Sequence, residues 1–159
     1  VTVEAAPKDD VWKFEKLKQL GVKPEERPDL YDDAADPDGD GIPNLLEYAI
    51  DGDPLGAGDF GDSVGTGTAA EEPEPGEEKE HFLLFQYKRL KPSIDDSITY
   101  QLQYSTDLKT WHDADTMIES TQPVEDLGND YERVTVRMKD PLEPAAPRFM
   151  RLKVIKAEE

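Results

Sequence analysis

Acidic side chains between residues 36 and 47 alternate with turn-forming residues in a pattern that suits a hard cation. Asp36, Asp38 and Asp40 are separated by Pro and Gly, and Glu47 ends the segment. Calcium takes roughly six to eight oxygen ligands at about 2.3–2.6 Å, and alternating carboxylates in a tight loop supply them without crowding. The segment fits the pattern D-x-[DN]-x-[DN]-G-x5-E at every defined position. We therefore predict a calcium ion as the cofactor of this loop.

The residues of the loop have distinct expected roles in holding the ion. Three aspartates give one carboxylate oxygen each, one residue offers its backbone carbonyl, and a glutamate closes the site with both carboxylate oxygens. The expected metal ligands are Asp36, Asp38, Asp40, Ile42 and Glu47. Gly41 lets the backbone turn sharply, and Asn44 is a candidate for holding a water ligand.

A plain acidic loop is the competing interpretation, because Asp-Gly and Asp-Pro are ordinary turn signals. That interpretation places three mutually repelling carboxylates close together without a cation, and it leaves the position of Glu47 unexplained. Ile42 stands at the seventh position of the loop and Pro43 at the eighth. A proline there disfavours the strand pairing that joins twinned EF-hands, so we expect a single, unpaired loop.

A short helix is predicted before the loop. Apolar residues recur every three positions from Val11 to Leu20, after an N-cap at residues 9 and 10 and before Gly21 as a C-terminal stop. We expect Trp12 or Phe14 on the packed face of this helix.

A second short helix and then a linker are predicted after the loop. The helix covers residues 43–50, with Pro43 at its first position, where no hydrogen-bond donor is lost, and it stops at Gly52 and Pro54. From residue 56 to residue 80 the composition is dominated by Gly, Ala, Pro, Glu and Asp, which is typical of a linker.

The rest of the chain has the alternation of half-buried strands, which is clearest in residues 99–104. Five strand-like runs occur at residues 81–90, 98–105, 111–120, 131–139 and 147–155. The sequence thus predicts a mainly β fold with a small α part. Its expected parts are a helical calcium-binding segment at residues 1–55, an acidic linker at 56–80 and an antiparallel β-sandwich at 81–159.

The charge of the chain restricts its partners and its setting. The formal net charge is −19, and residues 1–80 hold 23 Asp and Glu against 7 Lys and Arg. Nucleic acid and anionic membranes repel such a surface, so we expect neither as a partner. The chain has no cysteine and no apolar run of the roughly 20 residues that a membrane span needs. These features favour divalent cations, a secreted or cell-surface location and no membrane insertion.

Residues 36–54 also resemble a known kind of segment. Asp-Pro-Asp-Gly-Asp-Gly is similar to a thrombospondin type 3 repeat, and the order DPDGDG, NLLEYA and GDP resembles surface proteins of planctomycete and verrucomicrobial bacteria. In those proteins the segment follows a Trp-containing helix, which Trp12 would supply, and it precedes a β-domain that residues 100–111 and 148–154 resemble. The resemblance implies a module at the C-terminus of a large secreted protein, with no activity of its own.

Other candidate residues have simpler explanations. Four aspartates, Asp51, Asp53, Asp59 and Asp62, fit no ligand template and match a linker composition. Asp32 and Asp33 could lend an oxygen to the ion, but solvated loop charges are the favoured explanation for them. The two histidines, His81 and His112, have no zinc-binding or catalytic spacing, and no nucleophile pairs with a base.

We therefore expect a non-catalytic, calcium-stabilised structural or attachment module, whose partner beyond calcium is a surface protein or a polysaccharide. The alternative is a carbohydrate-binding module appended to a secreted polysaccharide-degrading enzyme. In that alternative Trp111, Tyr87, Tyr100 and Tyr104 would form a sugar-stacking platform, but aromatic residues spaced by two along strands belong more often to a core.

Overall fold

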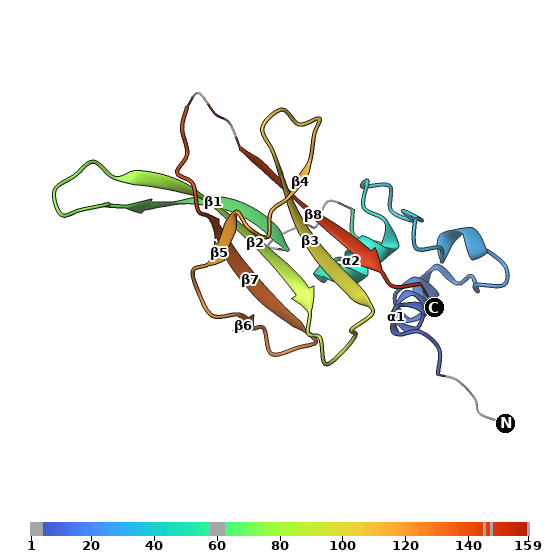
Figure 1. The fold of residues 1–159 in the computed structure, drawn as a ribbon. Helices are drawn as coiled ribbons and strands as arrows, with labels where there is room; N and C mark the ends of the chain where they lie inside the picture. The colour runs from blue at the N-terminus through green and yellow to red at the C-terminus, as the bar shows by residue number, and fades with distance from the viewer. Residues whose placement is uncertain (1–4, 58–62, 145, 147, 159) are drawn as a thin grey trace. The chain divides into compact units, whose positions relative to one another are not determined.

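The fold is mainly β with a small α part, as predicted (Figure 1). The computed structural model describes residues 5–57, 63–144, 146 and 148–158. The chain divides into two compact units, Val1–Ser63 and Val64–Glu159. The first unit carries the helices and the second carries the strands. No helix in the described part of the chain combines the length and the apolarity that crossing a bilayer requires.

The first helix, α1, covers Lys8–Leu17 and continues into a 3-10 turn, η1, at Lys18–Leu20. Gly21 ends it with a φ of 72°, as predicted. The predicted N-cap is wrong: Pro7 is the N-cap, and Asp9 lies inside the first turn, where it is buried. An acidic side chain in the first turn also interacts favourably with the helix dipole.

The second helix, α2, covers Asn44–Ile50, after a 3-10 turn, η2, at Pro28–Leu30. Pro43 is its N-cap rather than its first helical residue. The two helices meet through aromatic rings, because the ring of Trp12 lies 5.5 Å from that of Tyr48 between centroids. Trp12 is thus the aromatic residue of α1 that packs inward.

The second unit consists of two antiparallel sheets. The larger sheet has the order β1-β2-β7-β5, with β6 also paired to β7, and the smaller has the order β4-β3-β8. The larger sheet contains β1 (Val64–Glu71), β2 (Glu80–Leu90), β5 (Ile118–Ser120), β6 (Glu125–Asp126) and β7 (Tyr131–Met138). The smaller sheet contains β3 (Ile98–Ser105), β4 (His112–Asp113) and β8 (Phe149–Lys156).

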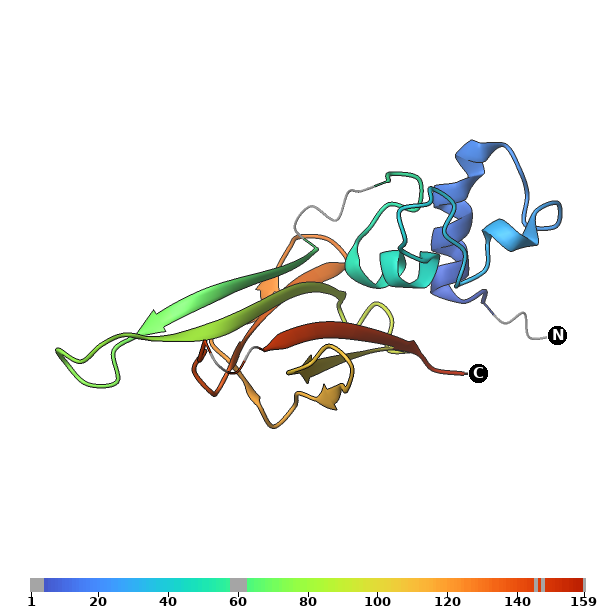
Figure 2. The same ribbon diagram turned by 90° about the horizontal axis from the view of Figure 1, so that it is seen from above.

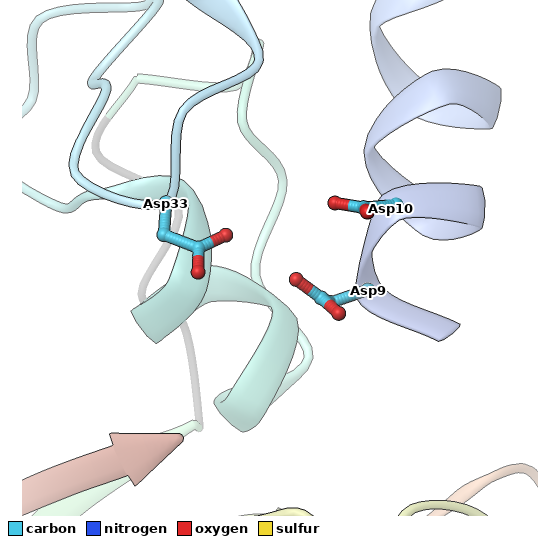
Figure 3. A group of neighbouring side chains, drawn as sticks. All are labelled: Asp9, Asp10 and Asp33. Carbon is cyan, nitrogen blue, oxygen red and sulfur yellow. The ribbon is translucent and has the colours of Figure 1, made fainter. Parts of the chain in front are cut away.

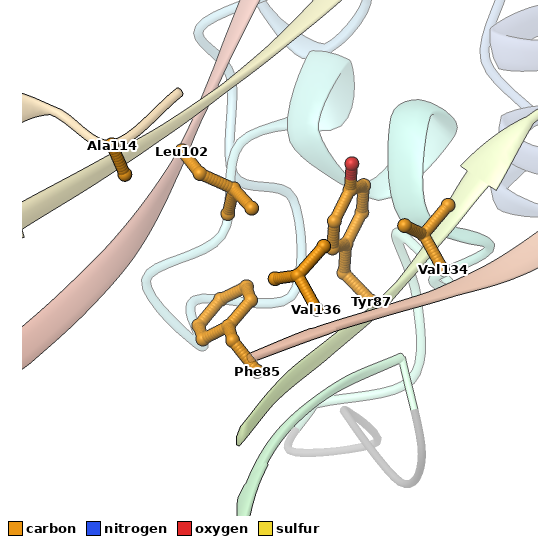
Figure 4. Packing of buried hydrophobic residues seen from close by; sticks show 6 residues of the cluster. All are labelled: Phe85, Tyr87, Leu102, Ala114, Val134 and Val136. Carbon is orange, nitrogen blue, oxygen red and sulfur yellow. The ribbon is translucent and has the colours of Figure 1, made fainter. Parts of the chain in front are cut away.

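A hydrophobic core joins the two sheets, as expected for a sandwich (Figure 4). The larger sheet contributes side chains from alternate positions of β2 and β7, and the smaller sheet contributes Leu102 from β3 together with Ala114, which follows β4. The buried cluster is Phe85, Tyr87, Leu102, Ala114, Val134 and Val136. The period of two seen in the sequence therefore places one face of β2, β3 and β7 in the core.

Two sequence predictions for this unit need correction. Residues 64–71, which we assigned to the linker, form β1 and pair with β2 from Val64 opposite Tyr87 to Glu71 opposite Glu80. The run at residues 111–120 is two short strands in different sheets, β4 and β5, rather than one strand. In the first case pairing with β2 overrides the low strand preference of the Gly and Ala residues that make up half of this segment.

The hairpin of β1 and β2 extends beyond the rest of its sheet (Figure 2). Strand β7 pairs with β2 only over Leu84–Leu90, so the outer part of the hairpin is a two-stranded ribbon. The turn at its tip carries several exposed glutamates.

Candidate metal centre

The three aspartates of the loop converge as the calcium pattern requires. One carboxylate oxygen from each of Asp36, Asp38 and Asp40 lies within 4.8 Å of the others. Carboxylates whose oxygens lie this close together repel one another, and a cation among them would offset that repulsion. The structure thus brings together three of the five predicted ligands.

Backbone amides of the loop fix the direction of these carboxylates. The amides of Gly39 and Gly41 donate to Oδ1 and Oδ2 of Asp36, both at 2.9 Å, and the amide of Ile42 donates to Oδ1 of Asp40 at 2.9 Å. Gly41 has a φ of 93°, which a residue with a side chain rarely adopts, so the predicted sharp turn is present. The hydrogen bonds from Gly41 and Gly39 hold the pKa of Asp36 below its usual range.

Asp38 is placed differently from Asp36. Its Oδ1 accepts the amide of Asp40 at 3.2 Å, whereas its Oδ2 is buried without a hydrogen-bond partner. Burial raises the pKa of the Asp38 carboxyl, and the negative charges of Asp40 and Asp36 act in the same direction. A buried carboxylate oxygen without a donor is unfavourable in an unligated protein and suits a metal ligand.

Glu47 is the most strongly perturbed carboxyl group of the site. It lies on α2, is only 3% exposed, and its Oε2 is buried without a hydrogen-bond partner. Burial raises its pKa from 4.5 to about 8, and the charges of Asp38, Asp40, Asp53 and Asp36 add to the effect. The sequence therefore places a carboxyl group where its ionised form needs a nearby positive charge.

The backbone on either side of the loop is tied together just behind the site. The amide of Asn44 donates to the carbonyl of Ala35 at 2.8 Å, and the amide of Leu45 donates to that of Asp33 at 3.0 Å. The side-chain nitrogen of Asn44 donates to the carbonyls of Leu30 and Asp32, both at 2.9 Å. Asn44 therefore anchors the start of α2 to the entry of the loop through its nitrogen, while its Oδ1 is buried without a hydrogen-bond partner. Its role in holding a water ligand stays a prediction.

The fifth predicted ligand, Ile42, has a buried side chain that is 6% exposed. The hydrogen bond from its backbone N–H to Asp40 places the backbone nitrogen of Ile42 next to the carboxylates. That the backbone carbonyl of Ile42 binds the calcium ion stays a prediction.

A second group of acidic residues, Asp9, Asp10 and Asp33, also converges (Figure 3). In this group the positive charge is already present. The ammonium of Lys13 lies 3.3 Å from Asp9 Oδ2, 2.8 Å from Asp10 Oδ1 and 2.5 Å from Asp33 Oδ1. Burial acts to lower the pKa of Lys13, but the hydrogen bonds to Asp10 and Asp33 and the charge of Asp9 outweigh it, so the pKa is raised. Lys13 thus does for this group what a metal ion would do.

Sequence reasoning missed the Lys13 group, although a signal for it was present. Asp9 and Asp10 precede Lys13 by four and three positions, which is the spacing of ion pairs on one helix face. The contribution of Asp33, the candidate extra oxygen donor for the calcium, comes from a residue 20 positions away and has no local signal. Asp59 and Asp62, two of the four weaker candidates, lie outside the described residues.

The aromatic residues of the sandwich belong mainly to its core. Tyr87 is buried and stacks on Tyr100 at 6.0 Å between ring centroids, and Tyr104 packs against the same cluster. Trp111 lies outside this cluster, with the guanidinium of Arg151 4.2 Å from the centre of its ring. The preference for core over platform is therefore confirmed for the three tyrosines.

Comparison of the chain with protein-family models, curated proteins and solved structures finds no significant match.

Proposed function

We propose that this chain is a non-catalytic, calcium-stabilised structural or attachment module of a secreted or cell-surface protein. The observation that carries the proposal is the convergence of Asp36, Asp38 and Asp40 beside the buried, partnerless carboxylate oxygens of Asp38 and Glu47. An ordinary acidic loop would turn such groups toward water, where their charges are solvated.

Calcium suits this site better than the other common metal ions. Every predicted ligand is an oxygen, and four of the five ligands are carboxylates, which hard cations prefer. Magnesium demands a tighter octahedral shell and keeps several of its waters, whereas calcium accepts an irregular shell and a bidentate glutamate. The site is therefore expected to respond to calcium at concentrations at which magnesium has little effect.

The ion would stabilise the helical unit through α2. Glu47 is held by this helix, and its neighbour Tyr48 packs against Trp12 of α1. A cation bound by Glu47 and the loop would fix α2 against the preceding segment and maintain the helix pair. At a calcium concentration 100 times the Kd, binding adds about 2.7 kcal/mol to the free energy of unfolding.

The composition of the chain supports the proposed location. A strongly acidic, cysteine-free chain with a calcium site suits the calcium concentrations outside cells, where sites with Kd of about 10⁻⁴–10⁻³ M are occupied. The carbohydrate-binding alternative would depend on Trp111, because the three tyrosines of the proposed platform pack in or against the core.

The test is the thermal midpoint of the whole chain in EDTA, in millimolar calcium and in millimolar magnesium. We expect calcium to raise the midpoint and magnesium to raise it much less. An equal midpoint in EDTA and in calcium would reduce the Asp-rich segment to an acidic loop and refute the proposal.

A further inference from the structure

We propose that the outer face of the smaller sheet binds a polysaccharide that carries carboxylate groups, and that Arg151 contacts those carboxylates. This surface would serve the proposed attachment role, on which the inference rests, and it gives that role a class of partner. It lies in the second unit, apart from the predicted calcium ligands. The outer face consists of Gln101, Gln103, Trp111, Arg151 and Lys153.

The pairing of β3 with β8 places the side chains of this face next to one another. Side chains at even positions of the two strands lie in the core or pack against it, namely Tyr100, Leu102, Tyr104, Met150 and Leu152. Because side chains alternate between the two faces of a strand, those at odd positions point away from the core. Gln103 stands directly opposite Arg151, and Gln101 stands opposite Lys153. Arg151 and Lys153 are both exposed.

Arg151 is held in a defined position on this face. Its Nε donates to Oε1 of Gln103 at 2.9 Å, and its guanidinium lies 4.2 Å from the centre of the Trp111 ring. A guanidinium that stacks on an aromatic ring keeps its other N–H groups in its own plane, where a carboxylate can accept two of them. Since the side chain is already ordered, little of its conformational freedom remains to be lost on binding.

The two cations of the outer face lack acidic partners, although acids outnumber bases in this chain by 37 to 18. The other five arginines, Arg27, Arg89, Arg133, Arg137 and Arg148, all form ion pairs. Within the described part of the chain, neither Arg151 nor Lys153 forms one. Residues 148–156 also contain four Lys and Arg and no acid. The outer face therefore complements a negatively charged partner, unlike the rest of the chain.

The glutamines favour a polysaccharide over an acidic peptide as that partner. Each amide group can donate and accept hydrogen bonds, which suits sugar hydroxyls. Gln101 Nε2 also donates to Asp113 Oδ2 at 3.1 Å, so the same row offers a carboxylate as an acceptor for hydroxyls. A sugar acid supplies a carboxylate for Arg151, hydroxyls for this polar row and apolar C–H groups for the indole of Trp111. An extended peptide would pair with the edge of a sheet rather than with its face.

The test is calorimetric titration of the full chain with tetrasaccharides of glucuronate, galacturonate and mannuronate, each compared with its carboxyl-reduced form. We expect at least one acidic tetrasaccharide to bind, and reduction of its carboxylates to weaken binding roughly tenfold or more. Binding of none of the three, or equal affinity for the acidic and reduced forms, would overturn the inference.

A conservative substitution tests the role of Arg151. Arg151→Lys keeps the charge but loses the planar pair of donors, so it should weaken binding roughly tenfold. Arg27→Lys is the matched control, because Arg27 is an exposed arginine of the first unit that pairs with Asp29. The control should change the affinity by less than about twofold. Equal effects of the two substitutions would contradict the assignment of Arg151.

Fluorescence and competition test the location of the site and the class of partner. In a Trp12→Phe background, saturating tetrasaccharide should change the emission of Trp111, and unchanged emission at saturation would place the sugar elsewhere. A peptide of ten glutamates should compete poorly. Competition at the same concentration as the tetrasaccharide would identify the face as a site for acidic peptides and overturn the inference.

Repeating the titration in EDTA separates this inference from the calcium proposal. Because the outer face belongs to the second unit, the affinity for the tetrasaccharide should be the same in EDTA and in millimolar calcium. Sugar binding without any effect of calcium on the thermal midpoint would refute only the calcium-stabilised function. A calcium-dependent midpoint without sugar binding would refute only this inference. Sugar binding that disappears in EDTA would place the carboxylates on the ion instead of Arg151 and also overturn it.

Discussion

At the scale of single residues, the first unit is governed by how its buried carboxylates are neutralised. Glu47 and Asp38 have oxygens without hydrogen-bond donors, whereas Asp9 has the ammonium of Lys13 beside it. In the metal-free protein we therefore expect the loss of the Glu47 charge to raise stability and the loss of the Lys13 charge to lower it.

The pKa of Glu47 predicts how the metal-free protein responds to pH. Its folded-state pKa is about 8, above the ordinary value of 4.5, so the folded state binds more protons than the unfolded state between these values. The contribution of this group to stability is therefore full below about pH 4.5 and is lost as the pH rises through about 8. Denaturation in EDTA at several pH values should show this decline, and Glu47→Gln should remove it. A stability that rises over the same range in the wild-type chain, with no change in slope in Glu47→Gln, would contradict the assignment.

Glu47→Gln should have opposite effects on calcium binding and on the stability of the metal-free protein. Glu47→Gln should abolish most calcium binding, because it removes the bidentate ligand. It should nevertheless raise the thermal midpoint in EDTA at pH 7, because burial and the charges of Asp38 and Asp40 force Glu47 to take up a proton on folding, whereas Gln needs none. Glu78→Gln is the matched control, since Glu78 is an exposed residue between β1 and β2. The control should change neither quantity, and retained calcium affinity in Glu47→Gln would show that the loop assignment is wrong.

At the scale of elements, the ion pair between Lys13 and Asp33 links α1 to the segment that leads into the loop. Lys13→Met should destabilise the first unit by roughly 3 kcal/mol, because it removes the ammonium that lies beside buried Asp9 and half-buried Asp33. Lys18→Met, which removes an exposed pair with Glu15, should change the stability by less than about 0.5 kcal/mol. Urea denaturation followed by Trp12 fluorescence in a Trp111→Phe background would measure both changes. Equal effects of the two substitutions would mean that burial of the Lys13 group is unimportant.

Strand β1 gives a second test at this scale. If residues 64–71 are a strand, Gly67→Ala should stabilise the second unit by about 0.5–1 kcal/mol, and the new Cβ would meet Leu84 at an ordinary contact distance of 4.0 Å. Gly76→Ala should destabilise it by about 1 kcal/mol, because residue 76 has a φ of 91° in the turn. Thermal melting measures both changes. A flexible linker would leave both variants at the wild-type midpoint.

The sequence predicted the convergence of the three loop aspartates, but it did not predict β1 or the Lys13 group, for physical reasons. The ligands of a 12-residue loop are near neighbours, so the spacing of Asp36, Asp38 and Asp40 contains most of their geometry. The alternation in residues 99–104 likewise reflects one buried face of a strand. By contrast β1 is specified by its partner β2, and the Lys13 group depends on Asp33, so neither leaves a local pattern in the chain.

At the scale of the whole molecule, the division into two units predicts that calcium acts on only one of them. Every predicted ligand lies in the unit Val1–Ser63. Calorimetry of the full chain should therefore show two transitions, and saturating calcium should raise only the transition that Trp12 reports, by on the order of 10 °C. Fluorescence of Trp111 in a Trp12→Phe background follows the other unit. A calcium-dependent shift of both probes together would mean that the units unfold cooperatively.

The ammonium of Lys13 affects how the first unit responds to a change in calcium concentration. Two cations would neutralise the acidic groups of the first unit. One is the Lys13 ammonium, which belongs to the polypeptide, and the other is the proposed calcium ion, which would have to come from solution. Removal of calcium from the solution should therefore affect the loop and α2, while α1 keeps its ion pair with Asp33. In the helical unit the loop and α2 would then become less ordered, whereas α1 would stay bound to Asp33. Calcium would therefore rebind to a site that is already partly formed.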